Sequence, residues 1–583
     1  MDLTRIQRIF PIAGRLGGYG SGDLGGDAVA GLTVGILVVP QGMAYALLAG
    51  VPPIYGLYAA LVPLLVYPLL GTSRHLAVGP VALDMLILAA GLGAIAEAGT
   101  PRYVALALLV TLLVGLFQIL LGGLRLGFLA AFLSRPVISG FTSAAGLIIA
   151  VTQLGPLVGV DLPGGPGLSV LAAIPPLLSE VHLPSLALGL SGLAVLWALD
   201  RWRPLWPGAL VVVGSGMLAA ALVDLAGRGV VLLGDVPGGL PVPALKEVSL
   251  GDVSAVLPTV LTLGLIQFLN VVALGKVFAV KHRYAVSPNR ELVAVGAANV
   301  AGSLFRSLPI SGSYSRTAIN DRAGARTALS NVAAAGVVGL TLAFATPLFR
   351  FVPLPALAAV IVHAGISLID PSELKGLLRL KPRDGALALL TLTATLVIGI
   401  QEGILLGVGA SMVAIIYQMS RPHVAELGLL PGTTFYRDRA RNPEALPLED
   451  FLILRVDASY AFPNADYLKE VILDRARRRR GGIRAVILDG SSINDLDTTA
   501  LEALQTVEED LADEGTELHL AGIIGPVRDV LKRSVLYARL GPAHLHLSVH
   551  RAVKYVLAEW DMQEDTDRLG EYRAFTEEVA GSE

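Results

Sequence analysis

Long runs of apolar residues, separated by short segments rich in Gly, Pro and charged residues, occupy the chain up to residue 420. A helix needs ~20 mainly apolar residues to cross the hydrocarbon core of a bilayer. The pattern therefore predicts a multi-pass α-helical membrane protein with fourteen spans, two of them short. We place the spans at residues 27–49, 53–71, 80–97, 103–122, 127–153, 184–200, 207–225, 255–279, 289–304, 312–322, 327–348, 353–369, 384–399 and 403–420.

The pattern changes near residue 432, where charged residues become frequent and short apolar runs alternate with helical segments. The runs 451–456, 485–490 and 517–522 are typical of buried strands. Helices are expected near 464–480, 497–512, 525–535 and 548–559, which gives a soluble α/β domain. The predicted segments are an N-terminal segment (1–21), a transport domain (22–421), a linker with the start of the soluble domain (422–447), the soluble domain (448–560) and a tail (561–583).

Two interrupted spans occupy matching places in the two halves of the membrane part. Fourteen spans divide into seven plus seven, and an odd half reverses orientation in its second copy, so we expect an inverted repeat. The third span of the first half, "HLAVGPVALDMLIL" (75–88), and that of the second, "RSLPISGSYSRTAIND" (306–321), are both broken by Pro and Gly. A pair of interrupted segments at corresponding positions indicates the binding site of a transporter.

The residue types in these broken spans favour an anion. Non-helical backbone at membrane depth persists only where it lines a cavity or is buried in protein. Each half-helix then begins inside the membrane, and its free N–H groups favour negative charge by ~0.3–2 kcal/mol. Ser313, Ser315 and Thr317 add hydroxyl donors, and Arg316 adds a full positive charge. The alternative interpretation is that small hydroxyl residues only let the helices pack closely.

Composition and charge refine this prediction. The 583 residues are 54% hydrophobic and 16% charged, and the absence of Cys excludes disulfide and thiolate chemistry. Lys and Arg are concentrated in the segments that lie inside when the N-terminus is cytoplasmic, which places both termini in the cytoplasm. Arg is commoner than Lys, and Ala and Gly are abundant, as in GC-rich bacterial genomes. We therefore expect a multi-pass protein of the bacterial inner membrane, with no nucleic-acid partner.

Several motifs resemble one known family. "AGLTVGILVVPQGMAYALLAGVPPIYGLYAALVP" (30–63), followed by "GTSRHLAVGP" (71–80), is similar to the signature of the sulfate permease (SulP) anion transporters. "SYSRTAIND" and "AGARTALSN" (313–331) fit the same family, and the soluble domain resembles its STAS domain. The resemblance implies a seven-plus-seven inverted repeat like that of uracil permease, in which a core domain and a gate domain move against each other.

The resemblance also implies which residues bind the substrate. The anion would lie between the starts of spans three and ten, faced by spans one and eight. Gln41 and Tyr45 would face it from span one, and Val81 and Ala82 would offer backbone N–H groups. Ser313, Tyr314, Ser315 and Arg316 would form the opposite wall. We also expect a homodimer in the lipid bilayer.

Coupling depends on acidic groups within the membrane. Many relatives carry an acid where this chain has Asn270, and members that use sodium add a hydroxyl where it has Leu274. A sodium site on span eight is therefore not expected, and Asn270 cannot carry a proton. Asp84 is the other candidate for coupling, because an intramembrane carboxylate is a functional candidate by default. It could instead be a buried structural partner.

These observations predict a secondary active transporter of a small anion, with proton-coupled symport as the expected mechanism. Sulfate, bicarbonate and carboxylates such as fumarate or succinate all suit a site with one cation and two helix starts. An anion exchanger or anion channel of the same family is the alternative. We expect no enzyme, cofactor or metal site, because the sequence carries no metal-spaced cluster, nucleophile motif or Walker motif.

Overall fold

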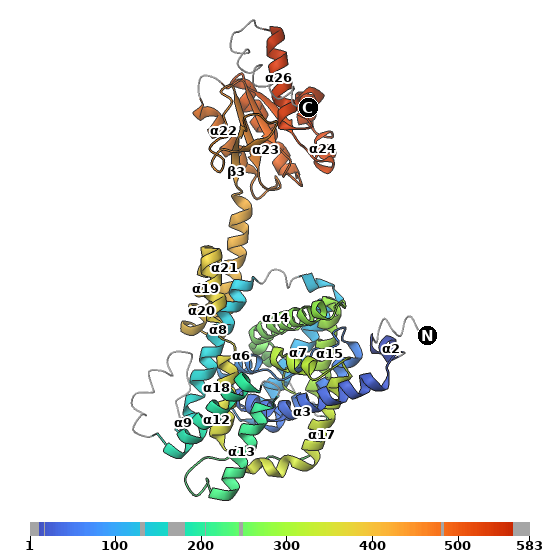
Figure 1. Cartoon of the computed structure of the whole chain (residues 1–583), viewed down its shortest axis with the longest axis vertical. Helices are drawn as coiled ribbons and strands as arrows, with labels where there is room; N and C mark the ends of the chain where they lie inside the picture. Colours follow the sequence, from blue (N-terminus) through green and yellow to red (C-terminus); the bar gives the residue numbers. More distant parts are fainter. Residues whose placement is uncertain are drawn as a thin grey trace. The chain divides into compact units, whose positions relative to one another are not determined.

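The chain, seen in a computed structural model, folds into two compact units, Met1–Ser411 and Met412–Glu583. The model describes residues 11–16, 18–128, 134–160, 181–203, 206–243, 249–479 and 483–563 (Figure 1). Residues 1–10 of the predicted N-terminal segment and 564–583 of the predicted tail lie outside this described part. The described part of the N-terminal segment holds the short helix α2 (Pro11–Leu16).

The first half of the membrane unit consists of apolar helices that end at Gly, Pro or short polar turns. Its third span is a two-residue strand, β1 (Val78–Gly79), followed by the half-length helix α6 (Ala82–Gly93). The remaining helices are α3 (Ser21–Leu48), α4 (Ile54–Ala59), α5 (Val62–Leu70), α7 (Pro101–Gly123), α8 (Arg135–Thr152), α9 (Leu154–Val158), α12 (Leu183–Trp202) and α13 (Gly208–Val223).

The second half repeats this order. Its third span is again a short strand, β2 (Ser311–Gly312), followed by a half-length helix, α16 (Tyr314–Arg322). The other helices are α14 (Leu250–Lys281), α15 (Pro288–Leu304), α17 (Leu329–Leu340) with its extensions η3 (Thr341–Ala345) and η4 (Thr346–Phe351), α18 (Leu354–Ile366), α20 (Pro382–Val397) and α21 (Ile400–Ser420). An amphipathic helix between two spans, α19 (Pro371–Leu380), was not predicted from the sequence.

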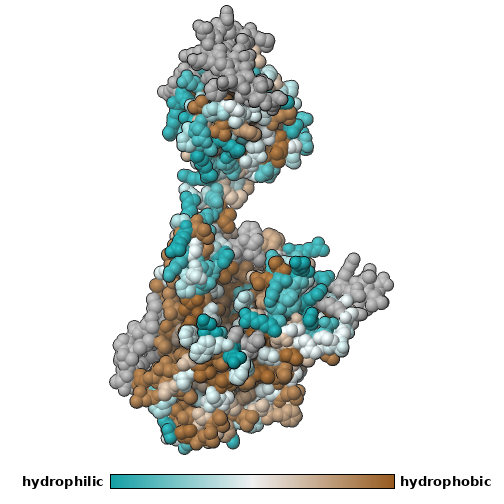
Figure 2. Space-filling model, viewed as in Figure 1, coloured by the Kyte–Doolittle hydropathy of each residue, from teal (hydrophilic) through white to brown (hydrophobic). Residues whose placement is uncertain are grey.

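Each of the fourteen predicted spans coincides with helix in the described ranges, which confirms a multi-pass helical membrane protein. By length and composition alone, eight of the described helices can cross a bilayer, and the shorter apolar helices include α6 and α13. Figure 2 shows hydrophobic residues over much of the visible surface of this unit. Large apolar side chains such as Leu24, Trp197, Leu222 and Phe344 are exposed there, as expected where lipid replaces water.

Helix packing follows the inverted repeat. α3 packs against α17, and the repeat-related pair α14 and α7 does the same. Three further contacts have a counterpart in the other half: α7–α15 corresponds to α17–α5, α8–α20 to α18–α12, and α3–α16 to α14–α6. These contacts gather α3, α5, α7, α14, α15 and α17 around the two half-helices, and α8, α12, α13, α18 and α20 into a second group (Figure 1).

The second unit is an α/β domain built on a six-stranded sheet of order β4-β3-β5-β6-β7-β8. The strands β5 to β8 run parallel, and β3 is antiparallel to β4 and β5. Its elements are β3 (Val424–Leu429), β4 (Tyr436–Asp438), β5 (Phe451–Val456), α22 (Ala465–Arg478), β6 (Ala485–Asp489), α23 (Thr498–Asp513), β7 (Glu517–Ala521), α24 (Gly525–Leu531), α25 (Val535–Leu540), η5 (Pro542–His544), β8 (Leu545–His546) and α26 (Val549–Gln563).

Alternating residues of the strands serve two hydrophobic cores. Leu452 and Leu454 pack with α22, α23, α24 and α25, whereas Phe451 and Ile453 pack with α26 on the other face. The sequence located β5, β6, β7 and three of the helices to within a few residues. It treated 525–535 as one helix, where the structure has α24 and the start of α25, and it missed β3, β4 and β8, which are short or lie in the segment 422–447.

Candidate functional site

The two broken spans meet at a two-stranded antiparallel sheet. Val78 of β1 pairs with Gly312 of β2, and Gly79 pairs with Ser311. The backbone N–H of Ser313 extends this pairing by donating to the carbonyl of Ala77 at 3.2 Å. All four paired residues are buried, so the extended backbone lies inside the protein, as its polar groups require at membrane depth.

Both half-helices begin directly after this strand pair. Val81 is the extended N-cap of α6 and provides no side-chain cap. Ser313 is the N-cap of α16, and its hydroxyl accepts from the backbone N–H of Arg316 at 3.5 Å. The first N–H groups of a helix have no acceptor within the helix. The strand pair thus brings two helix N-termini, each with a partial positive charge, into one small region.

Arg316 lies in the first turn of α16 with only 1% of its surface exposed. Its Nη1 donates to the Oε1 of Gln41 on α3 at 3.4 Å, which is a long hydrogen bond. Its Nε and Nη2 are buried without a hydrogen-bond partner among the described residues. The guanidinium also lies against β1, because a Cβ added at Gly79 would stand 3.3 Å from Nη2. A buried, partly unpaired cation therefore lies beside the two helix starts.

The structure brings most of the predicted site residues together around this cation. Gln41 contacts Arg316 directly, and the buried Tyr45 follows one turn later on the same helix, α3. Val81 and the buried Ala82 form the start of α6. Ser315 approaches Ser313, with 3.3 Å between their hydroxyl oxygens. Tyr314 differs, since its side chain is 61% exposed and its ring faces Phe278 of α14 at 6.1 Å.

Asp84 is completely buried in the first turn of α6 and belongs to a chain of polar side chains. Its Oδ2 accepts from the Nε2 of Gln267 on α14 at 3.0 Å, and its Oδ1 has no hydrogen-bond partner among the described residues. Gln267 in turn accepts from Gln118 of α7 at 2.9 Å. The amide of Asn299 on α15 donates to Gln118 at 3.1 Å and accepts from the backbone N–H of Ile310 at 2.9 Å. This series of hydrogen bonds connects the helices α6, α14, α7 and α15 to Ile310, the residue directly before β2.

Asn270, the second predicted coupling residue, lies in a different place. It is half-buried and lines an apolar crevice with Leu83 of α6, Phe141 of α8 and Ile404 of α21. One turn later, Leu274 packs against the break in span ten, because a Cβ at Gly312 would meet its Cδ1 at 3.4 Å. Apolar packing occupies the position at which the resemblance locates a hydroxyl for sodium.

The extended segment that leads into β1 is held by polar side chains from other helices. The carboxylate of the fully buried Glu291 accepts from the backbone N–H groups of Thr72 and Ser73, at 2.6 and 2.9 Å, and from the Tyr67 hydroxyl at 2.7 Å. Asn331 of α17 donates to the carbonyl of Leu76 at 3.0 Å. These bonds replace the helical hydrogen bonds that the broken span lacks.

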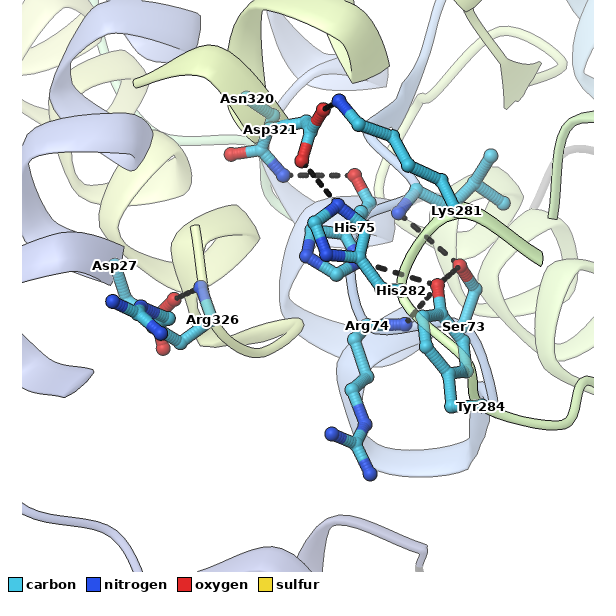
Figure 3. A network of polar contacts seen from close by, with 11 residues as sticks. Asp27, Ser73, Arg74, His75, Lys281, His282, Tyr284, Asn320, Asp321 and Arg326 are labelled. Atoms are coloured by element: carbon cyan, nitrogen blue, oxygen red, sulfur yellow. Dashed lines mark hydrogen bonds and ion pairs between the residues drawn. The ribbon is translucent and has the colours of Figure 1, made fainter. Parts of the chain in front are cut away.

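A second polar network, shown in Figure 3, connects residues 73–75 of this segment to the C-terminal ends of α14 and α16. The Tyr284 hydroxyl lies 3.2 Å from the Ser73 hydroxyl and accepts from the backbone N–H of Arg74 at 3.2 Å. The His75 ring stacks on that of His282, with 4.1 Å between ring centroids. Asn320 of α16 donates to the carbonyl of His75 at 2.8 Å.

Asp321 completes this network at the end of α16. His282 bonds one of its oxygens at 2.6 Å, and Lys281 forms an ion pair with the other at 2.5 Å. His75, His282 and Asp321 are close enough to share a metal ion, but Lys281 already supplies a cation to the only carboxylate of the three. We interpret the network as a structural anchor for the two broken spans.

An open recess of about 390 Å³ lies near this anchor and is lined by Tyr19, Asp23, Arg74, Arg326 and Thr327. The backbone N–H groups of Arg326 and Thr327 donate to the buried carboxylate of Asp27, at 2.7 and 2.9 Å (Figure 3). Arg74, Arg326 and Asp23 therefore line one open depression together.

The polar residues that position the proposed site were not predicted from the sequence. Gln118, Gln267 and Asn299 are isolated within apolar spans, Glu291 stands beside Arg290 at the start of a span, and no motif distinguishes any of the four. The signal that could have found them is their rarity, because polar side chains within membrane spans usually face protein or a cavity. Only their partners in the fold show which role each one has.

Comparisons with known proteins agree with this architecture. The model of the sulfate permease family matches residues 24–391, and the model of the STAS domain matches residues 442–552. A probable sulfate transporter of Mycobacterium tuberculosis (strain H37Rv) is 35% identical over 531 residues, which cover 91% of this chain and 95% of the relative. The chloroplastic sulfate transporter 4.1 of Arabidopsis thaliana is 34% identical over 576 residues, or 95% of this chain and 83% of the relative.

Two solved structures share the fold. The murine Slc26a9 anion transporter in its inward-facing state has a TM-score of 0.87 at 23% identity, over 96% of this chain and 95% of that one. The transmembrane domain of the cyanobacterial bicarbonate transporter BicA has a TM-score of 0.59 at 26% identity, over 68% of this chain and 98% of that one. We conclude that the chain belongs to the sulfate permease family, a family of membrane transporters and not of enzymes, and that it carries a STAS domain.

Proposed function

We propose that this chain is a secondary active transporter of a small anion. The observation that carries the proposal is Arg316, a buried cation whose Nε and Nη2 lack partners in the described residues. Burying an unpaired charge is costly, and a bound anion would remove that cost. The names of the relatives support the substrate class, because sulfate and bicarbonate are both small anions.

The proposed site holds the anion between the starts of α6 and α16. Arg316 would donate from Nε and Nη2, the first turn of α6 from its backbone N–H groups, and Ser313 and Ser315 from their hydroxyls. Gln41 would keep the guanidinium in place through its bond to Nη1. Sulfate, bicarbonate and carboxylates such as fumarate or succinate all present several acceptor oxygens to such donors.

Alternating access is the transport mechanism we propose. The half-helices and their partners α3 and α14 would form the moving core, and α8, α12, α13 and α18 the gate. Support for this division comes from the crevice at Asn270, where α6 and α14 face α8 and α21 across mainly apolar side chains. Apolar surfaces can slide without breaking hydrogen bonds. An anion exchanger or channel would use the same binding residues and remains the alternative.

Proton coupling through Asp84 is part of the proposal. Asp84 and Arg316 interact electrostatically, so the charge of the carboxylate alters the potential at the anion site. A protonated Asp84 leaves the full positive charge of Arg316 available to the anion, whereas an ionised one offsets it. Protons and anions would then bind with positive cooperativity, which is what symport requires.

We further propose that the protein works in the bacterial inner membrane as a homodimer, with both termini in the cytoplasm. The excess of Lys and Arg in the segments assigned to the inside supports the orientation. The STAS domain would then lie in the cytoplasm.

Uptake into liposomes tests the proposed function. Purified protein is reconstituted, and uptake of radiolabelled sulfate, bicarbonate and fumarate is measured with and without an inward proton gradient. We expect saturable uptake of at least one anion, accumulation driven by the proton gradient, and no change when choline replaces sodium. Uptake that stops without sodium would contradict the coupling proposal. Anion conductance without accumulation would support the channel alternative.

A further inference from the structure

The edge of the STAS sheet gathers an unusual number of histidines. The chain has nine His residues, and His519, His544, His546 and His550 all lie on β7, at β8 or at the start of α26. The membrane site does not involve any of them. Their sequence pattern around residue 544, "HLHLSVH", resembles an alternating strand and gives no sign of which side chains meet.

The register of the sheet brings these side chains to one face. In the parallel pair of β7 and β8, Leu520 lies beside Leu545 and Ala521 beside His546. One step back, His519 therefore lies beside His544. Side chains two residues apart on a strand point to the same face, so Glu517 joins them. Tyr555 of α26 covers this face, with its ring 6.3 Å from that of His519 and 5.2 Å from that of His546.

Three of these side chains have the spacing of metal ligands. Nε2 of the fully buried His519 lies 3.1 Å from Oε2 of Glu517, and the rings of His519 and His544 are 4.5 Å apart between centroids. One ligand atom from each of the three residues lies within 4.8 Å of the other two. A tetrahedral ion with bonds of ~2.1 Å holds its ligand atoms ~3.4 Å apart. Small side-chain rotations therefore suffice to close the site.

In His519 and His544, Nδ1 already forms a hydrogen bond, so Nε2 is the nitrogen left to bind a metal. Nδ1 of His544 bonds the backbone carbonyl of Leu540 at 2.5 Å, which leaves its Nε2 for a metal. Nδ1 of His519 bonds Nε2 of His546 at 3.1 Å, which leaves its Nε2 beside Glu517. Metal-ligating histidines almost always donate their other ring N–H to a carbonyl, a carboxylate or water, and such outer partners fix the ligating tautomer.

We propose that Glu517, His519 and His544 form a binding site for a divalent transition-metal ion, with Zn²⁺ as the expected occupant. Two imidazoles and a carboxylate are ligands that Zn²⁺ accepts, and three protein ligands leave a fourth position for water or another donor. The side chain of Glu517 is 48% exposed, so an ion can enter from solvent. His546 would act as a positioning residue through His519.

Bound metal would fasten the short edge strand to the sheet. β8 has only two residues and follows directly on η5, so few backbone hydrogen bonds hold it to β7. A Zn²⁺ ion shared by Glu517 and His519 of β7 and by His544, the residue directly before β8, would cross-link the two strands. The site would thereby stabilise the folded STAS domain without any part in anion binding.

The test uses the full chain in detergent after removal of metal with EDTA. Zn²⁺ is titrated against a chromophoric chelator, and Co²⁺ is added separately to follow the visible d–d absorption of a tetrahedral site. We expect about one tight site per chain, with metal bound to neutral imidazole and carboxylate. A Co²⁺ spectrum without such bands would overturn the proposal.

Matched variants assign the site. Glu517→Gln and His544→Gln should each weaken Zn²⁺ binding at least about 10-fold, and His546→Gln by about 10-fold to 100-fold, as for other outer partners. His282→Gln is the control for the group of His75, His282 and Asp321, and His423→Gln is the control within the STAS domain; both should bind Zn²⁺ like the wild type.

Glu517 and His544 are not fully buried, so the Glu517→Gln and His544→Gln variants should fold, as size-exclusion chromatography can verify. Unchanged binding in both Glu517→Gln and His544→Gln, or its loss in His282→Gln, would place the metal elsewhere.

Discussion

Arg316 forms no ion pair with a carboxylate in the described part of the chain. Its direct partner, Gln41, is uncharged, and the carboxylate of Asp84 is bound to Gln267. Two of the guanidinium nitrogens lack partners in the described part of the chain, and each unmet donor costs ~1–3 kcal/mol. The protein therefore stores unfavourable energy at this residue, which a bound anion can recover as affinity.

Replacing Arg316 by Ala should abolish transport without unfolding the protein. Removing a buried cation with unmet donors costs little stability, so we expect Tm to change by no more than a few degrees. Uptake should fall at least about 100-fold, since a charged hydrogen bond and the site's full charge are both lost. Arg350→Ala, at an exposed arginine over Phe351, is the control and should transport normally. Normal uptake by a folded Arg316→Ala protein would contradict the site.

Asp84→Asn should separate anion binding from proton coupling. The amide imitates the protonated acid, so anion affinity should become independent of pH, whereas in the wild type it should rise as pH falls. Accumulation driven by a proton gradient should be lost while exchange of anion across the membrane persists. Binding measured by isothermal titration and uptake in liposomes test the two parts. Glu402→Gln, at an exposed acid in α21, should leave both unchanged. If Asp84→Asn behaves like the wild type, Asp84 is structural.

Charged residues of the proposed site could be predicted from the sequence, whereas its uncharged polar residues could not. Arg316 and Asp84 are charges within apolar spans and stand out at once. Gln118, Gln267 and Asn299 carry no charge and follow no period, so their role is defined only by the helices that bring them to Asp84. Tyr314 was predicted from its motif, and on α16 its ring lies 6.1 Å from that of Phe278 between centroids.

The strand pair β1–β2 is the element on which the proposed anion site depends. Pro and Gly breaks in the sequence predicted where each helix stops, but the pairing of Val78 with Gly312 could not be predicted, since two residues give no periodic pattern. The pairing determines which side chains lie between the half-helices. Gly79 is essential to it, because its φ of +143° is a conformation that other residues rarely adopt.

Gly79→Ala should weaken anion binding through this element. The new Cβ strains the backbone and lies 3.3 Å from Nη2 of Arg316, so the guanidinium must shift. We expect at least about 10-fold weaker binding, which corresponds to ~1.4 kcal/mol, with the helices intact. Gly93→Ala, at the end of α6 where no atom lies within 4 Å of an added Cβ, is the matched control. Equal binding by the two variants would show that the strand pair does not position Arg316.

At the scale of the whole molecule, each unit has its own core. The membrane unit is built on the buried residues around α3, α6 and α18, and the STAS domain on two cores that flank its sheet. The segment 422–447 was predicted as a linker together with the start of the soluble domain. Within it, β3 starts at Val424 and lies inside the sheet, between β4 and β5.

This architecture predicts the effect of removing the STAS domain. A chain cut after Arg421 loses the whole domain and keeps every proposed anion-binding residue. It should therefore still bind the anion with an affinity within about threefold of the wild type. A cut after Pro431 retains Val424–Leu429, an apolar strand deprived of both neighbours, and unpaired strands of this kind promote aggregation. We therefore expect the shorter chain to be monodisperse and the longer one to aggregate, as size-exclusion chromatography would show. Complete loss of anion binding in a monodisperse chain cut after Arg421 would mean that the STAS domain contributes to the anion site.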